Sequence, residues 1–355
     1  MEYIVIKIGE STLKLPSQEL VSIASESDFY GAKNLLADYL GENSIHSLKG
    51  VWQHGWIPDY TMIDPLVVTT SMDADQKIKP FYVAKLAQKE YLEKHHYKKI
   101  KVIGAPIIYL PKIKFKKIKR SLLVMPAHSL DKIDNKINFR NYAAQINSLK
   151  KDFDLIVVCL HSSCIKKGYW IDEFAEYNIP YIEGSNVSDR NCLYRLQALF
   201  SQFEYVTSNG YGSHLPYSAY FGAKTSIFGD YGKILSEDRV NEPYYKKYPQ
   251  LLNTFIPLLS EKNVKKQFPI LFCEPSKAIE QIEWAKYELG YNNKLNKKEV
   301  RKIILIKGPI MITVLKKIRL IYSLMVPEVF KLVYRYLRSP KDLESIREKK
   351  DGERR

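Results

Sequence analysis

The stretch Asp154-Leu155-Ile156-Val157-Val158-Cys159-Leu160 decides the fold. After its first residue it is entirely apolar and rich in β-branched residues, with no polar residue in between. A strand of this kind is buried on both faces, as happens in a parallel sheet with helices on either side. The sequence on both sides of this stretch continues the same pattern.

Five extended segments alternate with helical spacing within residues 122–228. The extended segments are 122–125, 154–160, 179–184, 205–207 and 223–228, and the helical ones are 139–153, 169–177, 192–203 and 215–221. Strands that alternate with helices form a parallel sheet. We therefore predict an α/β fold with a Rossmann-like domain in this half of the chain.

The first half predicts a second and less regular Rossmann-like domain. Extended segments are expected at 3–6, 45–52, 66–70 and 100–104, and helical ones at 28–40 and 81–95. The basic segment 112–120 is the predicted boundary. We expect domains at 1–115 and 120–290, basic amphipathic helices at 294–340 and a disordered tail at 341–355.

The composition is that of an ordered protein. The chain has 355 residues, enough for two domains, and its 45% hydrophobic content argues against general disorder. Its four cysteines show no CxxC spacing, so neither a disulfide framework nor a zinc site is predicted, and a reducing cytoplasm fits best. The first residues do not resemble a signal peptide, and no apolar window reaches the length of a spanning helix.

The positive charge is concentrated at the C-terminal end. Residues 294–355 hold 18 Lys or Arg against 7 Asp or Glu, a balance of +11 out of the total +16. Basic residues that alternate with long apolar ones favour an anionic membrane surface, so we expect a peripheral protein on the inner face of the cell membrane. The alternative is a pair of helices that close back over the main fold. Nucleic acid is not an expected partner, because few aromatic residues are free to stack on bases.

A glycine-rich loop, Ser208-Asn209-Gly210-Tyr211-Gly212-Ser213-His214, follows the fourth of the extended segments and precedes a helix. Such a loop offers backbone N–H groups to a phosphate. Other polar clusters follow neighbouring strands, at His128-Ser129, His161-Ser162-Ser163 and Glu183-Gly184. Because ligands bind outside the carboxyl ends of parallel strands, these clusters predict one site.

Three motifs carry a family resemblance: Trp52-Gln53-His54-Gly55-Trp56, Pro126-Ala127-His128-Ser129 and the glycine-rich loop. Over about residues 45–230 the chain resembles GT-B glycosyltransferases. More narrowly, it resembles bacterial enzymes of capsule or lipopolysaccharide assembly, including sialyltransferase-like and CDP-glycerol glycerophosphotransferase-like proteins. The resemblance implies two Rossmann-like domains that face a cleft, a nucleotide-sugar donor, a glycan or lipid-linked glycan acceptor, an inverting reaction and no cofactor.

The resemblance and the chemistry of the side chains together assign roles. Amides, hydroxyls and imidazoles would neutralise the leaving nucleotide without a metal. The predicted donor-binding residues are His128, Ser129, Glu183, Ser208, Asn209, Gly210, Gly212, Ser213 and His214. His54 is the predicted general base, because an imidazole titrates near neutral pH, with Asp59 and Asp64 as alternatives.

Other interpretations remain open at this point. Asp73-Ala74-Asp75 follows the extended segment 66–70, as in metal-dependent GT-A transferases, but a GT-A fold leaves the regular series at 122–228 unexplained. His161-Ser162-Ser163-Cys164 suggests a hydrolase, yet no G-x-S-x-G elbow surrounds the serines. A non-catalytic nucleotide- or glycan-binding protein of the same fold is a further alternative.

Overall fold

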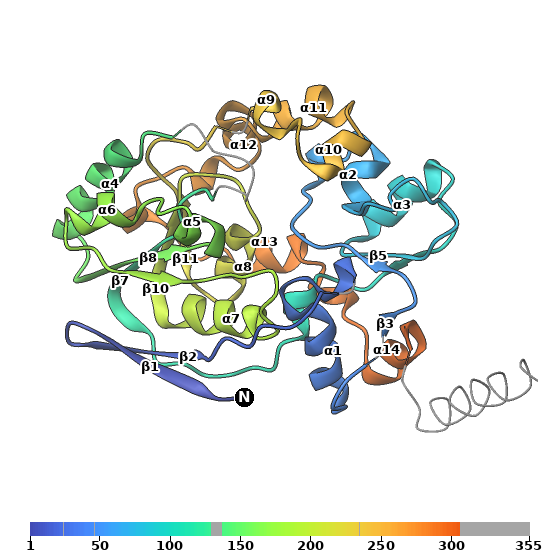
Figure 1. Cartoon of the computed structure of the whole chain (residues 1–355), viewed down its shortest axis with the longest axis horizontal. Helices are drawn as coiled ribbons and strands as arrows, with labels where there is room; N and C mark the ends of the chain where they lie inside the picture. The colour runs from blue at the N-terminus through green and yellow to red at the C-terminus, as the bar shows by residue number, and fades with distance from the viewer. Residues whose placement is uncertain (24, 46, 129–136, 234, 306–355) are drawn as a thin grey trace, which may run out of the picture. The chain divides into compact units, whose positions relative to one another are not determined.

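The computed structural model describes residues 1–23, 25–45, 47–128, 137–233 and 235–305. Within them, parallel sheets and many helices confirm the predicted α/β class (Figure 1). Residues 1–305 form one compact unit, and the predicted boundary at 112–120 stays a prediction. Ser129, the predicted helices beyond Leu305 and the predicted tail lie outside the described residues.

A five-stranded parallel sheet forms the larger part of the fold. Its strands are β7 (Ile118–Val124), β8 (Leu155–Leu160), β9 (Tyr181–Glu183), β10 (Phe203–Ser208) and β11 (Lys224–Ile227). They lie in the order β11-β10-β7-β8-β9, and all four neighbouring pairs are parallel. The chain moves outward from β7 to β9 and then returns to place β10 on the other side of β7. The strand order therefore reverses between β7 and β10.

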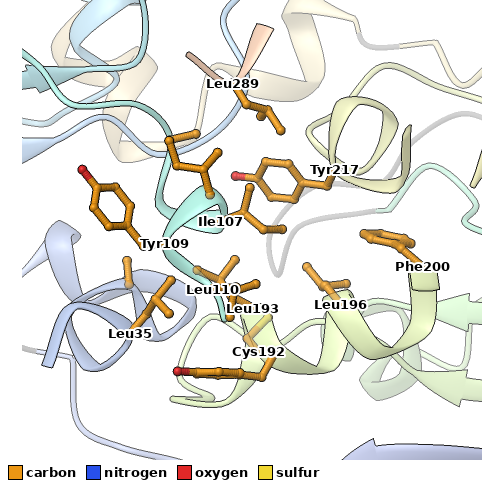
Figure 2. Packing of buried hydrophobic residues seen from close by; sticks show 14 of the residues in the cluster. Leu35, Ile107, Tyr109, Leu110, Cys192, Leu193, Leu196, Phe200, Tyr217 and Leu289 are labelled. Carbon is orange, nitrogen blue, oxygen red and sulfur yellow. The ribbon is translucent and has the colours of Figure 1, made fainter. Parts of the chain in front are cut away.

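Helices connect and cover these strands. They are α4 (Phe139–Asn147), α5 (Ser162–Lys166), α6 (Ile171–Ala175), α7 (Cys192–Gln202) and α8 (His214–Tyr220). Helix α7 is buried almost all round, which is typical of a helix inside a core. Figure 2 shows Leu193 and Leu196 of α7 in one cluster with Leu35 and Ile107 from the first part of the chain.

A smaller parallel sheet lies in the first part of the chain. It consists of β4 (Val51–Trp52), β5 (Phe81–Val83) and β6 (Ile100–Val102), in that order. Helix α2 (Pro65–Thr69) lies between β4 and β5 in the sequence, and α3 (Leu86–Lys94) lies between β5 and β6.

Two predictions for this part were wrong. Segment 66–70 is predicted as extended but forms α2. Pro65 occupies the first turn, and the Asp64 carboxylate caps the helix by accepting from the Leu66 amide at 2.8 Å. Segment 81–95 is predicted as one helix but begins as β5. Short apolar runs do not separate helix from strand by periodicity alone.

The remaining described strands form two antiparallel pairs. Strands β1 (Tyr3–Ile8) and β2 (Ser11–Pro16) form an antiparallel hairpin, and β3 (Ser47–Leu48) pairs with β12 (Ile304–Leu305). The other helices are α1 (Ala32–Leu40), α9 (Ser236–Arg239), α10 (Pro243–Lys247), α11 (Leu251–Thr254), α12 (Glu261–Gln267), α13 (Ile282–Glu288) and α14 (Lys297–Ile303).

The start of the predicted basic region belongs to the fold. Helix α14 buries Val300 and Ile303 and leaves Lys297 and Lys298 exposed. For this helix the structure therefore matches the alternative in which the segment packs on the main fold with solvated lysines. In the described part of the chain, no helix has the length and apolarity needed to cross a membrane.

Candidate functional site

A cavity of about 360 Å³ lies at the carboxyl edge of the five-stranded sheet. Its walls come from residues that follow four strands: 125–128 after β7, His161 after β8, Ser185 after β9 and 210–214 after β10. The first part of the chain also contributes lining residues, including Glu26, Ser27, Phe29, Tyr30, Trp52, His54 and Gly55. The reversal of strand order between β7 and β10 is where doubly wound sheets bind their ligands.

Six of the predicted site residues line this cavity. They are His54, His128, Gly210, Gly212, Ser213 and His214. Among the described residues, four other predicted ones, Asp59, Glu183, Ser208 and Asn209, do not line it. The sequence therefore located the cavity but did not separate the residues that face it from those that support it.

Ser208 and Asn209 shape the glycine-rich loop. Both are fully buried. The Asn209 side chain accepts from the Ala127 amide and donates to the Asp230 carbonyl, each at 2.8 Å, so it ties the segment after β7 to the segment after β11. The Ser208 hydroxyl accepts from the Gly210 amide at 3.2 Å. These groups are occupied within the protein and support the loop instead of facing the cavity.

The predicted carboxylates are also placed in structural roles. Asp59 pairs with the buried Lys85 at 2.6 Å and accepts from the Tyr287 hydroxyl at 2.7 Å. Asp64 is the cap of α2. The backbone carbonyl of Glu183 accepts from Arg195 at 2.8 Å. The Asp59 and Asp64 carboxylates are thus engaged within the protein, whereas the role of the Glu183 carboxylate stays a prediction.

Three histidines of the cavity wall each carry one buried ring nitrogen without a hydrogen-bond partner in the described part of the chain. The atoms are Nδ1 of His54, Nε2 of His161 and Nε2 of His214. A buried polar atom without a partner is costly, and a native site that collects several of them calls for a ligand or water to satisfy them.

Two of these histidines are held in the neutral form. Burial, with a smaller effect of His128, lowers the pKa of both His161 and His214 to about 3. Nδ1 of His161 accepts from the Ser163 amide at 3.1 Å, so the proton of the neutral ring lies on Nε2. His128 stacks on His161 with ring centroids 4.5 Å apart. His161 thus presents a neutral imidazole whose Nε2–H group can donate to a ligand in the cavity.

His54 lines the cavity from the loop after β4. Burial lowers its pKa, and the Glu26 carboxylate opposes this shift. Its ring packs edge-on against Phe29, with centroids 5.3 Å apart. An imidazole that stays unprotonated at neutral pH is able to accept a proton from a substrate.

Arg239, at the end of α9, is a cavity residue that the sequence did not reveal. It is the cationic side chain among the described lining residues. It pairs with Glu242, while its Nε is buried with no hydrogen-bond partner among the residues described. His161, from a polar cluster that the sequence assigned to this edge, also lines the cavity, and Glu26 and Ser185 are lining residues that the sequence did not reveal.

The loop that carries His54 is fastened to the glycine-rich loop. The Trp56 amide donates to the Ser213 hydroxyl at 2.8 Å, and the Tyr211 hydroxyl donates to the Trp56 carbonyl. The rings of Trp56 and Tyr211 stack with centroids 5.0 Å apart. A Cβ at Gly212 would lie 2.7 Å from the His214 ring, so glycine is needed there to leave this imidazole in place.

Asp73 and Asp75 do not form a metal site in this arrangement. The Asp73 carboxylate pairs with Lys79, and the Asp75 carboxylate pairs with Lys247 at 3.0 Å. Both follow a helix instead of the predicted strand, and neither lines the cavity. Within the described ranges, no group of three or more His, Cys, Asp or Glu could hold a metal ion.

The depressed histidine pKa values predict a pH-dependent stability. Unfolded His161 and His214 bind protons below about pH 6.5, whereas the folded ones do so only near pH 3. The unfolded state therefore binds more protons in this window, and stability falls as the pH drops. We expect a loss of about 2 kcal/mol per histidine between pH 7.5 and pH 5, measured by urea unfolding. His214→Gln should remove about half of this loss, because His161 still contributes its share. His95→Gln, outside the cavity, should leave the profile unchanged. Equal profiles for all three proteins would contradict the prediction.

Comparison with known proteins gives little further information. No family model matches the chain, and no curated protein matches it. A solved structure, the pneumococcal O-GlcNAc transferase GtfA in complex with UDP and GlcNAc, is 13% identical over 68% of this chain, with a TM-score of 0.30. The match spans 45% of that chain, less than half of its length. At this similarity neither a family nor an activity follows, and the function has to be inferred from the cavity.

Proposed function

We propose that this protein is a glycosyltransferase that moves a sugar, or a related phospho-polyol, from a nucleotide-activated donor to a surface-polysaccharide acceptor. One observation carries the proposal. Three histidines and Arg239 line one cavity where the strand order of a parallel sheet reverses, and each has a buried nitrogen without a hydrogen-bond partner among the described residues.

These nitrogens suit a nucleotide phosphate. The switch point of a doubly wound sheet is where nucleotides bind. When the bond between the sugar and the phosphate breaks, negative charge develops on the leaving nucleotide. The neutral Nε2–H donor of His161, together with the guanidinium of Arg239, would stabilise that charge.

His54 lines the same cavity and would act as the general base. Its neutral ring would take the proton of the acceptor hydroxyl as the hydroxyl oxygen forms its bond to the anomeric carbon. The bond from that carbon to the phosphate oxygen breaks at the same time, and the electron pair leaves with the nucleotide. Direct displacement of this kind inverts the anomeric centre. The donor set is built from nitrogens, so we expect no requirement for a divalent cation.

Residues 306–340 would hold the enzyme at an anionic membrane surface, close to a lipid-linked or membrane-proximal acceptor. The support for this part of the proposal is the basic and apolar alternation of that segment. A peripheral location on the inner face of the membrane would follow from it.

Nucleotide binding is the first test. We expect at least one of CMP, CDP, UDP and GDP to raise the melting temperature by several degrees at saturation, because a ligand at a hundred times its Kd stabilises by about 2.7 kcal/mol. Arg239→Ala should weaken that nucleotide about tenfold or more, since it removes a charge-assisted hydrogen bond. Isothermal titration calorimetry measures the affinity.

Arg140→Ala is the matched control, because Arg140 is highly exposed and lies outside the cavity. It should bind the nucleotide as the unmodified chain does. The donor-site proposal fails if none of the four nucleotides shifts the melting temperature, or if the two arginine variants bind equally well.

A further inference from the structure

A second pocket lies outside the cavity. Segment 267–270 forms one part of its lining, and residues 279–281 together with α13 form the other. We call this pocket the aromatic groove, and its volume is about 660 Å³. It is lined by Gln267, Phe268, Pro269, Ile270, Ile279, Glu280, Gln281, Ile282, Glu283, Trp284, Tyr287 and Glu288.

Several large side chains that line the aromatic groove are exposed to solvent. Ile270 is 53% exposed, Ile279 54% and Tyr287 58%. The rings of Phe268 and Trp284 also line it, with centroids 5.7 Å apart. A contiguous apolar surface of this kind on a soluble unit marks a place where something binds.

The groove also holds polar groups that lack a partner. Gln281 is only 9% exposed, and its Nε2 has no hydrogen-bond partner in the described ranges. The same holds for the buried Nε1 of Trp284. Each unmet donor is energetically unfavourable, and a ligand with hydroxyl oxygens would satisfy it after small side-chain rotations.

The charges on the groove walls are largely compensated. Glu288 accepts from Trp56 and pairs with Lys85, each at 2.8 Å, and Glu283 pairs with Lys286. Glu280 adds one more carboxylate, so an anionic ligand is disfavoured. What remains is a set of aromatic faces, unmet N–H donors and carboxylate acceptors.

We propose that the aromatic groove binds a neutral saccharide. The face of an aromatic ring is negatively polarised, so it attracts the C–H face of a sugar ring. The hydroxyl groups at the sugar edge can accept from Gln281 and Trp284 and donate to the glutamates. This combination of apolar faces and polar edges is the chemistry that the groove offers.

Trp56 separates the aromatic groove from the cavity. Its ring stacks on that of Tyr211, which lines the cavity. It also contacts the rings of Phe268 and Trp284, which line the groove, at centroid distances of 5.1 and 5.6 Å. The groove would thus hold a part of the glycan remote from the reacting hydroxyl. That role rests on the proposed function, whereas saccharide binding itself does not.

The test is saturation-transfer NMR on the full chain with maltotriose, cellotriose, chitotriose and lactose as probes. We expect transfer to at least one probe, and a loss of at least tenfold in Ile279→Arg, which places a long charged chain in the groove. Ile78→Arg is the matched control, because Ile78 is 72% exposed and lies outside the groove. It should bind the probe within twofold of the unmodified chain.

Two substitutions of Tyr287 distinguish the role of its aromatic ring from that of its hydroxyl hydrogen bond. Tyr287→Phe loses the bond to Asp59 but keeps the aromatic face and should still bind, whereas Tyr287→Ala should not. The proposal is overturned if no probe shows transfer, if Ile279→Arg binds normally, or if Ile279→Arg dissociates a dimer, which would make the groove an interface between copies. Saccharide binding without any nucleotide binding would refute the proposed function and leave this inference standing.

Discussion

His54→Ala should lower kcat by about 10²–10⁴-fold, the range that a general base contributes, while the Kd of the nucleotide changes little. The reason is geometric. His54 lines the same cavity as His161 and His214, and burial keeps its ring unprotonated at neutral pH. The measurement is nucleotide release from the nucleotide sugar whose nucleotide binds best, with affinity measured by calorimetry on the same variant.

Two further results are expected from this experiment. His95→Ala, at the end of α3 and outside the cavity, should keep full activity. In the pH profile of kcat/KM, the acidic limb that reports the base should disappear in His54→Ala. If His54→Ala transfers sugar at the normal rate, His54 is not the base. If the unmodified chain binds the nucleotide but transfers no sugar, the protein is a binding protein of the same fold.

Lys85→Met should cost about 3–5 kcal/mol of stability, because it leaves a buried carboxylate without its partner. The Lys85 side chain is 4% exposed and pairs with Glu288 at 2.8 Å and with Asp59 at 2.6 Å. Glu288 also accepts from the Trp56 indole. This cluster joins α13 to the loop of the proposed base, so its loss should destabilise the site as well as the fold. Urea unfolding at pH 7.5 measures the change.

Lys89→Met is the matched control for that experiment. Lys89 pairs with Glu93 on the surface of the same helix at 3.8 Å, and removing such a pair should cost about 0.5 kcal/mol or less. The double variant Lys85→Met with Glu288→Gln should regain part of the lost stability, since the buried charge is then gone. A cost below about 1 kcal/mol for Lys85→Met alone would contradict the structural role assigned to the cluster.

The regular part of the fold was predictable because its signal is local. A strand buried on both faces needs a continuous apolar run, and 154–160 matches β8 almost to the residue. The glycine-rich loop and His128 follow such strands, so the parallel arrangement alone places them at one edge. The irregular first half offered no such repeat, and segment 66–70 became a helix through its Asp64 cap and Pro65.

Only those site residues that directly follow a strand could be predicted from the sequence. Arg239 reaches the cavity from α9, after the sheet is complete, and no local pattern marks it. Asp59 had the chemistry of a base, but its partner Lys85 lies 26 positions further along the chain. Ser208 and Asn209 belong to the predicted loop, yet their polar groups are taken up by Gly210, Ala127 and Asp230, contacts that only the folded chain reveals.

The pairing of β3 with β12 sets the order in which this protein can be completed during synthesis. Residues 47–48 leave the ribosome early, but their strand partner at 304–305 is among the last described residues to be made. Trp56 likewise gains its hydrogen bonds to Ser213 and Glu288 only after those residues have been made. Contacts that close such long loops form slowly, and incomplete chains expose apolar surface in the meantime. The first part of the chain therefore cannot complete its β3 pairing or the contacts of its Trp56 loop until residues 213–305 have been made.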